Sequence, residues 1–412
     1  MGTMIQPSVS SPSIRSPWAA AVPPAPSAAR GADLFVPTAS TLEENTGLPR
    51  LKGLSCLALT VAGLVCGGAT ASAAAPPAHE ASVVEVADAG RAAAPSLRFH
   101  EDGTFKILQI TDVHFQPEAG PEYAAHYDRL IDGLLDSEKP DLVVITGDVL
   151  YWSNRPMNEY FDAAMAPMIR HQVPYAFVMG NHDAESTFTG KDILTYLQSQ
   201  PGSVSRPGPA ALGASGNYTV EIHGKGGATE SVLYMLDSHD HGAGMPDASP
   251  AEKDAYGWLT ADQVRWYGRT SEAFTHANRG VPEPSLMFFH IPLQEYNAAW
   301  SHQASGNRLE DESPQGRNTG MFGAIEAHHD VMGVFAGHDH VNDYVGSLHG
   351  VALGYGRKTG LSVYGPAPLE RGGRVIVLHE GKKTFDTWIR TESGRQETPI
   401  SFPSHFEQTS AD

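Results

Sequence analysis

Short apolar runs alternate with amphipathic stretches from about residue 105 onward. Three runs in the first half have the length and composition of strands, and two stretches with helical spacing lie between them. The strand candidates are residues 105–110, 142–146 and 175–179, and the helix candidates are residues 121–137 and 159–170. The run 142–146 is apolar throughout except at its end, which is typical of a strand buried on both faces. The order βαβαβ predicts an α/β architecture in which helices cover a sheet.

The second half of the chain is richer in strand candidates. Two of them flank a glycine-rich turn and two flank Gly381, so we expect a hairpin at each place. Thr260 is placed to cap a helix over residues 261–277. Residues 303–317 are polar and are predicted to form a loop. The strand candidates are residues 218–223, 231–236, 286–289, 331–336, 375–378 and 384–389.

Length and charge narrow the class of protein. The 412 residues are 41% hydrophobic, which is enough for one large domain or two tightly joined ones. A formal net charge of −19 argues against a general attraction to nucleic acid or to anionic membranes. A small positive pocket is still compatible with this charge, because a bound metal ion dominates its surroundings.

The N-terminal region has the layout of a secretory signal peptide. Arg50 and Lys52 precede an apolar run over residues 54–65, and Ala71-Ser72-Ala73 fits the small-x-small cleavage pattern. The run is too short to span a bilayer comfortably, so we expect a periplasmic or secreted protein without a stable membrane anchor. The predicted organisation has five parts. These are an extension or misassigned start (1–49), the signal peptide (50–73), a linker (74–96), one domain (97–395) and a tail (396–412).

Both cysteines, Cys56 and Cys66, lie in this leader region. A chain cut after Ala73 has neither, so we expect no disulfide framework and no thiol chemistry. Lipidation of Cys66 is disfavoured because the residue before it, Val65, is bulky.

Five of the apolar runs end in Asp, Asn or His. In an open α/β sheet, ligands bind outside the carboxyl ends of the strands, so these five ends are predicted to converge on one site. Residues two apart, as in DxH and HxH, point the same way if they lie in extended chain. In chain order, the residues are Asp112 and His114; Asp148; Asn181, His182 and Asp183; His290; and His338 and His340.

The chemistry of this set indicates a binuclear metal site. Carboxylate and amide oxygens with imidazole nitrogens, and no thiolate, suit Fe, Mn or Zn. The number of side chains exceeds what one ion takes and suits two ions about 3.5–4 Å apart, bridged by a carboxylate. A DxH or HxH alone is more often a polar loop, but five such blocks after five strands form a specific pattern. His239 and His241 in DSHDHG lack a partner block, so we expect no metal there.

The blocks DxH, GD, GNHD, H and GHDH resemble the calcineurin-like metallophosphoesterase superfamily over residues 105–343. The stretches GWLTADQVRWY, HIPLQEY, GHDHVND and YGRKTG are similar to its compact purple-acid-phosphatase-related branch. The resemblance implies an α/β fold, classed as α+β in some schemes. Its core would be a β-sandwich of two mixed sheets flanked by helices, with a dimetal site at the carboxyl ends of the strands.

The resemblance also implies a role for each residue of the site. Asn181 and His182 would face the substrate. His182 would stabilise the phosphoryl group or protonate the leaving oxygen, and Asp183 would orient His182. The metal ligands would divide into three groups. These are Asp112, His114 and His340 for the first ion; Asn181, His290 and His338 for the second; and Asp148 as the bridge.

Two further residues, Tyr151 and Arg357, are each compatible with more than one role. The stretch GDVLY also fits the block in which true purple acid phosphatases bind ferric iron through a tyrosine. Those enzymes have DxG where this chain has His114, so we interpret Tyr151 as a pocket or packing residue and expect a protein that is not purple. Arg357 in YGRKTG is a candidate substrate contact, because arginine presents a fork of donors to phosphate. A loop salt bridge is the open alternative.

Together these observations predict an exported dimetal phosphoesterase that hydrolyses small phosphate esters through a metal-activated water. A phosphomonoesterase is favoured, and a phosphodiesterase on the same site is the alternative. A non-catalytic metal-binding protein would be expected to have lost a ligand or His182, and neither is lost here. We expect no nucleic-acid partner. The oligomeric state, the natural substrate and the native metals stay open.

Overall fold

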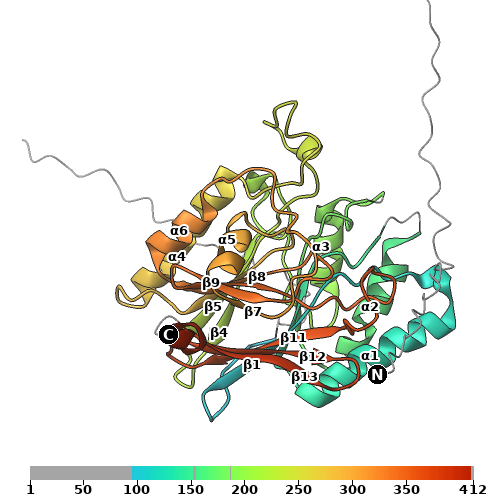
Figure 1. The fold of residues 1–412 in the computed structure, drawn as a ribbon, viewed down its shortest axis with the longest axis horizontal. Helices are drawn as coiled ribbons and strands as arrows, with labels where there is room; N and C mark the ends of the chain where they lie inside the picture. Colours follow the sequence, from blue (N-terminus) through green and yellow to red (C-terminus); the bar gives the residue numbers. More distant parts are fainter. Residues whose placement is uncertain (1–94, 152–154, 186, 410–412) are drawn as a thin grey trace, which may run out of the picture. The chain divides into compact units, whose positions relative to one another are not determined.

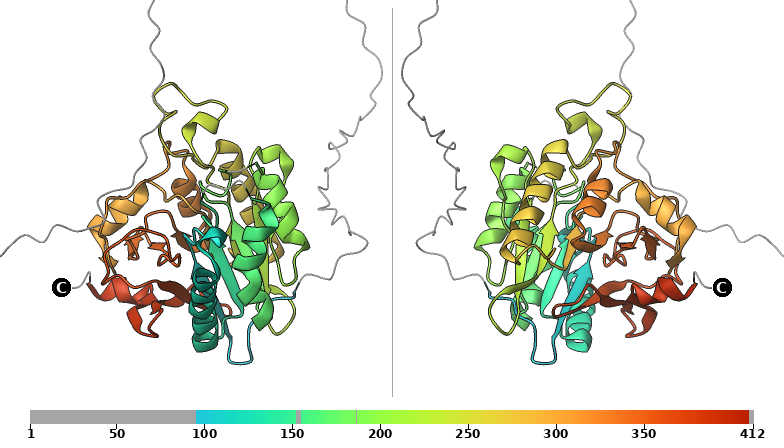
Figure 2. Two further views of the ribbon diagram at one scale, coloured as in Figure 1. Left: turned by 90° about the vertical axis from the view of Figure 1, so that its right-hand side faces the viewer. Right: turned by 90° about the vertical axis from the view of Figure 1, so that its left-hand side faces the viewer.

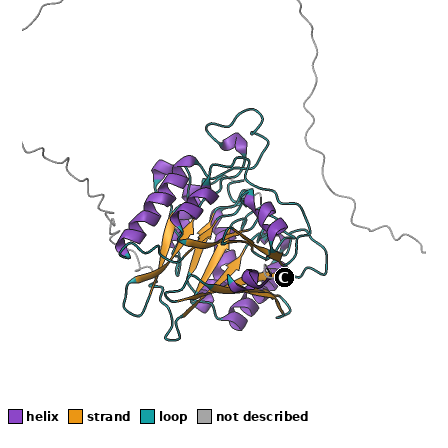
Figure 3. Cartoon of the chain, turned by 60° about the vertical axis from the view of Figure 1, so that its left-hand side comes forward, coloured by secondary structure: helices purple, strands orange, loops and turns teal. Residues whose placement is uncertain are grey.

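The computed structural model describes residues 95–151, 155–185 and 187–409 (Figure 1). Within them, strands form the centre and helices lie outside them, as Figure 3 shows by colour. The extension, the signal peptide, both cysteines and most of the linker fall outside the described residues, so the predictions for them stay predictions. None of the helices in the described residues has the length and hydropathy that a membrane span requires.

The first sheet has six strands in the order β13-β12-β11-β1-β2-β3. The strands β1, β2 and β3 run parallel, and the other neighbours pair antiparallel. Their bounds are β1 Thr104–Ile110, β2 Leu142–Thr146, β3 Tyr175–Val178, β11 Gly372–His379, β12 Phe385–Thr391 and β13 Gln396–Phe402. The expected tail beyond residue 395 is therefore wrong in part, because β13 pairs with β12 and completes the edge of this sheet.

The second sheet has seven strands in the order β4-β5-β6-β8-β10-β9-β7. The four strands from β5 to β10 in this order run parallel, and antiparallel pairs flank them. Their bounds are β4 Tyr218–His223, β5 Thr229–Met235, β6 Ser285–Phe288, β7 Ala304–Ser305, β8 Val331–Ala336, β9 Val345–Leu348 and β10 Val351–Tyr355. Both sheets are mixed, as the sequence led us to expect.

Helices cover the outer face of each sheet (Figures 1 and 2). Side chains of α1, α2 and α3 pack on the first sheet, and those of α4, α5 and α6 pack on the second. A third apolar cluster joins the facing sides of the two sheets. The helices are α1 Pro121–Glu138, α2 Met157–His171, α3 Gly190–Ser199, α4 Ala261–Ala277, α5 Glu295–His302, α6 Met321–His328 and α7 Ser404–Thr409. The chain is thus a four-layer sandwich, with burial on both faces explaining its continuous apolar strands.

The predicted elements are confirmed, with shifts of a few residues at some ends. Thr260 caps α4 in a reciprocal capping box with Gln263. The structure adds α3, α5, α6, α7, β7, β9, β10 and β13, which the sequence pattern did not reveal. These elements are short, so each has too few turns or alternations to show a clear period. The stretch 303–317 is a loop apart from the two-residue β7.

Candidate metal centre

The predicted ligands gather where the carboxyl ends of strands from both sheets meet. Ligand residues follow β1, β2 and β3 of the first sheet and β6 and β8 of the second. All seven are buried, with at most 9% of any one exposed. Burying this many ionisable groups is unfavourable unless they are paired or bind an ion.

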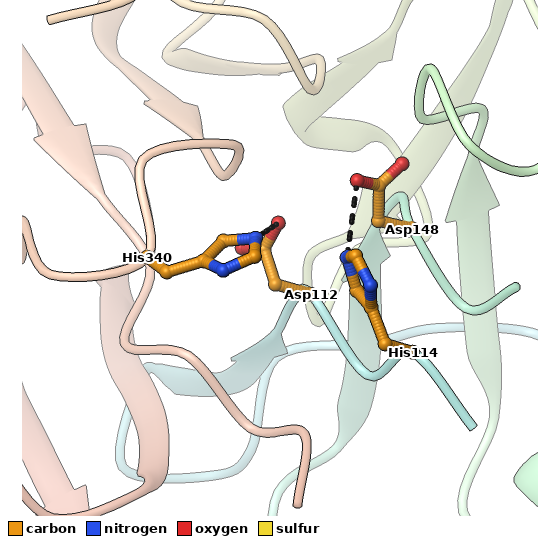
Figure 4. Close-up of side chains that lie close together, drawn as sticks. All are labelled: Asp112, His114, Asp148 and His340. Carbon is orange, nitrogen blue, oxygen red and sulfur yellow. Dashed lines mark ion pairs between the residues drawn. The ribbon is translucent and has the colours of Figure 1, made fainter. Parts of the chain in front are cut away.

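Four of the ligands form one compact cluster, shown in Figure 4. One ligand atom from each of Asp112, His114, Asp148 and His340 lies within 4.8 Å of the others. The imidazoles of His114 and His340 meet edge to face, with ring centroids 5.1 Å apart. Three separate segments of the chain thus supply one potential ion site.

Asp148 connects this cluster to the remaining ligands. Its Oδ2 lies 3.3 Å from His114 Nε2 and 3.2 Å from His290 Nε2. The ring of His290 lies 5.1 Å from that of His338, which extends the site to the second group. A carboxylate between two sets of ligands has the position of a bridging group.

Several buried ligand atoms have no hydrogen-bond partner among the described residues. The orientation of one of them, His290 Nε2, has a clear cause. His290 Nδ1 donates to the carbonyl of Thr146 at 2.7 Å, so Nε2 is directed into the site. The unpartnered ligand atoms are His114 Nε2, Asn181 Oδ1, His290 Nε2, His338 Nε2 and His340 Nδ1. Buried polar atoms are rarely left unpaired, so this donor set fits bound metal ions.

Four of the ligand residues have an uncommon backbone conformation. Asp112, His114, Asp148 and His338 have φ angles of 51°, 43°, 54° and 78°, in the left-handed region. Residues other than glycine rarely adopt it, and such strain is concentrated at functional sites. Strand alternation therefore does not aim Asp112 and His114, because both lie beyond the end of β1. Left-handed turns direct them instead.

The loops that follow β2 and β3 come so close together in the site that the second of them needs a glycine. A Cβ on Gly180 would lie 2.1 Å from Asp148 Oδ1, so only glycine allows the carboxylate to sit there. The neighbouring backbone NH of His182 donates to the same oxygen at 2.9 Å. The glycine of GNHD thus makes room for the central carboxylate.

The charges of the site are strongly coupled. Burial opposes ionisation of Asp148, but the charges of His290 and His114, whose Nε2 atoms lie 3.2 and 3.3 Å from its Oδ2, hold its pKa well below its usual range. Burial also opposes protonation of His290, yet Asp148 raises the pKa of His290 to about 10. Burial and the charge of His290 lower the pKa of His338 to about 3. The centre therefore favours one positive charge beside Asp148, which is the arrangement that a cation also satisfies.

His182 lies at the edge of the site, with 26% of its side chain exposed. Its Nε2 is 4.0 Å from Asp148 Oδ2, and its Nδ1 is 2.7 Å from Glu185 Oε2. Burial opposes protonation of His182, but the bond to Glu185 and the charge of Asp148 raise its pKa. The sequence analysis missed Glu185, although a carboxylate three residues after the histidine was the signal available.

The expected role of Asp183 is wrong. Its carboxylate accepts backbone hydrogen bonds from Asp148 at 2.9 Å, Leu150 at 3.0 Å and Gly180 at 2.7 Å. Asp183 therefore fixes the two loops that carry Asp148 and Asn181, and Glu185 is the residue that holds His182.

The expected substrate contact of Arg357 is also wrong. Arg357 is only 1% exposed, and its guanidinium pairs with Asp343 at 2.5 Å and Glu397 at 2.9 Å. It also donates to the carbonyl of Glu370 at 2.7 Å. The alternative of a salt bridge is the one that the structure supports, because a buried and paired guanidinium cannot turn toward a substrate.

Tyr151 and the second histidine motif lie around the centre. The ring of Tyr151 stacks on His114 with centroids 5.2 Å apart, as expected of a pocket or packing residue. His239 and His241 do not join the compact ligand cluster found in the described residues. The ring of His241 instead lies 5.6 Å from that of Tyr256.

Comparison with known proteins agrees with this geometry. The family model described as calcineurin-like phosphoesterase matches residues 105–342. The chain is 36% identical over 326 residues to probable inactive purple acid phosphatase 29 of Arabidopsis thaliana, covering 72% of this chain and 82% of the relative. It is 33% identical over 321 residues to probable inactive purple acid phosphatase 28 of the same plant, covering 71% and 79%.

A solved structure shares the fold. The crystal structure of a dimetal phosphatase from Danio rerio matches with a TM-score of 0.50 and 17% identity, covering 72% of this chain and 98% of that one. The family model spans more than half of the chain, and the plant relatives align over most of their length. The protein therefore belongs to the calcineurin-like phosphoesterase family, in its branch related to purple acid phosphatases.

Proposed function

We propose that the protein is an exported, dimetal-dependent phosphoesterase that hydrolyses small phosphomonoesters. One observation carries the proposal. Buried ligand atoms without partners surround Asp148, and the partly exposed His182 lies beside them. Such a centre binds cations on its inner side and meets a substrate on its outer side.

The ligand set divides as the family resemblance implies. Two ions held there would supply positive charge for the phosphoryl oxygens and would activate water as a nucleophile near neutral pH. Fe, Mn and Zn suit the donors. One ion would be held by Asp112, His114 and His340, the other by Asn181, His290 and His338, with Asp148 shared.

His182 is proposed to act on the leaving group. Glu185 bonds to its Nδ1, which leaves Nε2 as the nitrogen free to meet a substrate. The hydrogen bond to Glu185 and the charge of Asp148 raise the pKa of His182, which favours its protonated form. Donation of that proton to the leaving oxygen is general acid catalysis, which contributes about 10²–10⁴-fold.

A non-catalytic metal-binding protein is the second candidate. It is favoured by the names of the two Arabidopsis relatives, both of which are called probable inactive. The complete ligand set and the presence of His182 support the catalytic reading for this chain. A phosphodiesterase on the same centre is a variant of the catalytic proposal, because the metals would handle the phosphoryl group in both reactions.

The proposal extends to location and partners. The predicted signal peptide at residues 50–73 supports export to the periplasm or the medium, without a stable membrane anchor. The proposed partner is a small phosphate ester, and the acidic charge of the chain disfavours a nucleic acid. Fractionation of cells that express the full chain tests export, and retention in the cytoplasm would contradict it.

The first experiment measures hydrolysis of p-nitrophenyl phosphate and of bis-p-nitrophenyl phosphate. The purified chain is loaded separately with Mn, Zn and Fe, and its metal content is measured. His182→Ala and Asp148→Asn are compared with His276→Ala, an exposed histidine on α4 that serves as the control.

The outcomes separate the candidates. Metal-dependent turnover of the monoester, lost in the first two variants and kept in the control, supports the proposal. Cleavage of the bis-ester alone identifies a phosphodiesterase. Two bound metals without turnover of either ester would favour the non-catalytic reading.

A further inference from the structure

We propose that three tyrosines, Tyr151, Tyr256 and Tyr364, form an aromatic rim around the metal centre. This rim selects phosphate esters whose leaving group is a planar, uncharged aromatic ring. The inference deepens the proposed function and rests on it, since it concerns the substrate of the same site. The three tyrosines come from distant segments of the chain, so the sequence alone does not group them.

Each tyrosine of the aromatic rim contacts the imidazole of a different candidate ligand. Tyr151 stacks on His114 at 5.2 Å between centroids, with 25° between the ring planes. Tyr364 lies 4.4 Å from His340 at 31°. Tyr256 meets His338 edge to face at 4.3 Å and 88°.

Tyr151 also approaches the proposed acid. Its ring centroid lies 5.0 Å from that of His182 at an angle of 64°. The leaving group of a substrate has to lie beside the residue that protonates its oxygen. Tyr151 is therefore placed to contact the leaving group and not only the phosphoryl group.

Two of these rings are unusually exposed. Tyr151 is 49% and Tyr364 is 56% exposed. Among the described residues, only Val281 and Leu309 are comparably exposed large apolar side chains. A ring that rests on an imidazole with half its surface in water offers the remaining surface to a ligand. Aromatic rings bind one another through offset or edge-to-face contacts, and such contacts would seat an aryl group here.

The ring of Tyr364 is held in place before any ligand arrives. Its hydroxyl donates to Glu310 Oε2 at 2.7 Å, and its carbonyl accepts from Lys358 Nζ at 2.7 Å. The other oxygen of Glu310 accepts from the backbone NH of Val341 at 3.0 Å, next to the ligand His340. Glu310 thus fixes the tyrosine to the ligand loop, and a fixed ring loses little freedom on binding.

The charges near the aromatic rim indicate an uncharged leaving group. Lys358 is engaged with the carbonyl of Tyr364, and Arg308 pairs with Glu312 at 2.7 Å. Glu310 adds a carboxylate beside Tyr364. One ammonium and one carboxylate therefore contact Tyr364, and both are bonded to the tyrosine itself. The aromatic rim thus offers a ring surface without net charge, which favours an aryl monoester over a polyphosphate.

Binding of two phosphonates tests the inference without requiring turnover. Phenylphosphonate and cyclohexylphosphonate have rings of similar size, and only the first ring is planar and aromatic. Titration calorimetry with the full, manganese-loaded chain measures their Kd values. We expect phenylphosphonate to bind about 3- to 10-fold more tightly, which corresponds to an aromatic contact of about 0.7–1.4 kcal/mol.

Variants locate the preference in the aromatic rim. Tyr151→Leu and Tyr364→Leu should each reduce it at least about twofold, whereas the Phe variants at both positions should keep it. Glu310→Ala should reduce it as well, because Tyr364 loses its anchor. Val281→Ala is the control, since this residue precedes β6 at the opposite end of the strands. Metal content is measured for every variant.

Equal affinity for the two phosphonates, binding of neither, or a preference unchanged in both Leu variants would overturn the inference. Turnover with no aryl preference would overturn it while leaving the proposed function intact. An aryl preference in a chain that hydrolyses no ester would remove the proposed function and would support the aromatic rim as a binding device.

Discussion

Two charged clusters in the interior of the molecule are organised in opposite ways. One is the metal centre around Asp148, and the other is the ion cluster of Arg357, Asp343 and Glu397. In the ion cluster, positive and negative side chains neutralise one another. In the metal centre, four histidine nitrogens and one amide oxygen are buried near the carboxylates and have no hydrogen-bond partner among the described residues.

The difference shows how a structural ion pair is told apart from a binding site. Removing charges from water is unfavourable, so a buried charge that stabilises the fold is paired within the protein. A site for an external cation keeps atoms unpaired until the ion binds. Asp148 and Asp343 are buried to the same degree, and the partners of each carboxylate separate the two clusters.

The largest expected effect follows from Asp148→Asn. This change removes the charge shared by both groups of ligands and should lower phosphoesterase turnover by at least about 10³-fold, or ~4 kcal/mol in the barrier. Bound metal should fall below two ions per chain in elemental analysis. Asp141→Asn, which changes a carboxylate away from the centre, is the matched control and should retain both ions. Full activity in Asp148→Asn would contradict the assignment of the centre.

The next effect concerns stability. Arg357→Ala leaves the buried carboxylate of Asp343 without its ion-pair partner, so we expect the free energy of unfolding to fall by about 3–5 kcal/mol in denaturant titrations. The folded protein should keep its metals and its KM within about threefold. Arg395→Ala is the control: its guanidinium also pairs with Glu397 but is 56% exposed, so a loss of at most about 1 kcal/mol is expected. A large rise in KM with unchanged stability would restore Arg357 as a substrate contact.

A smaller effect is expected from the residue that holds His182. Glu185→Ala should lower kcat by about 10- to 100-fold with KM and metal content nearly unchanged, because the orientation of His182 is lost. Glu185→Gln retains a hydrogen-bonding group and should recover part of the loss. Glu118→Ala, at an exposed position, is the control. An unchanged kcat in Glu185→Ala would show that the hydrogen bond plays no part.

The smallest expected effect concerns Glu283, a buried carboxyl that belongs neither to the metal centre nor to the ion cluster. Burial and the charge of Glu230 raise the pKa of Glu283 to about 7. A raised pKa in the folded protein means that stability falls as the pH rises from about 4.5 to 7, where only the unfolded chain loses the proton. Glu283→Gln should therefore stabilise by about 1 kcal/mol at pH 8 and have no effect at pH 4, as measured by Tm. Equal gains at both pH values would contradict the shift.

The sequence predicted most of the architecture because the strands are apolar on both faces. The runs at β2 and β8 match their predicted bounds, and the capping of α4 by Thr260 is confirmed. Short elements such as α5 and β9 were not predicted, because their local pattern is weak and contacts with residues distant in the sequence stabilise them. The strand β13 was missed because its pairing with β12 cannot be read from its own composition.

The sequence by itself determined the fold class, the family resemblance and the seven candidate ligands, because these depend on residue types at strand ends. The tertiary structure decided what each neighbour of those ligands does. Asp183 accepts hydrogen bonds from backbone groups of two loops, Glu185 bonds to the ring of His182, and Arg357 forms an ion pair with Asp343. Such roles depend on which atoms come within hydrogen-bond distance after folding, and spacing along the chain does not fix that distance.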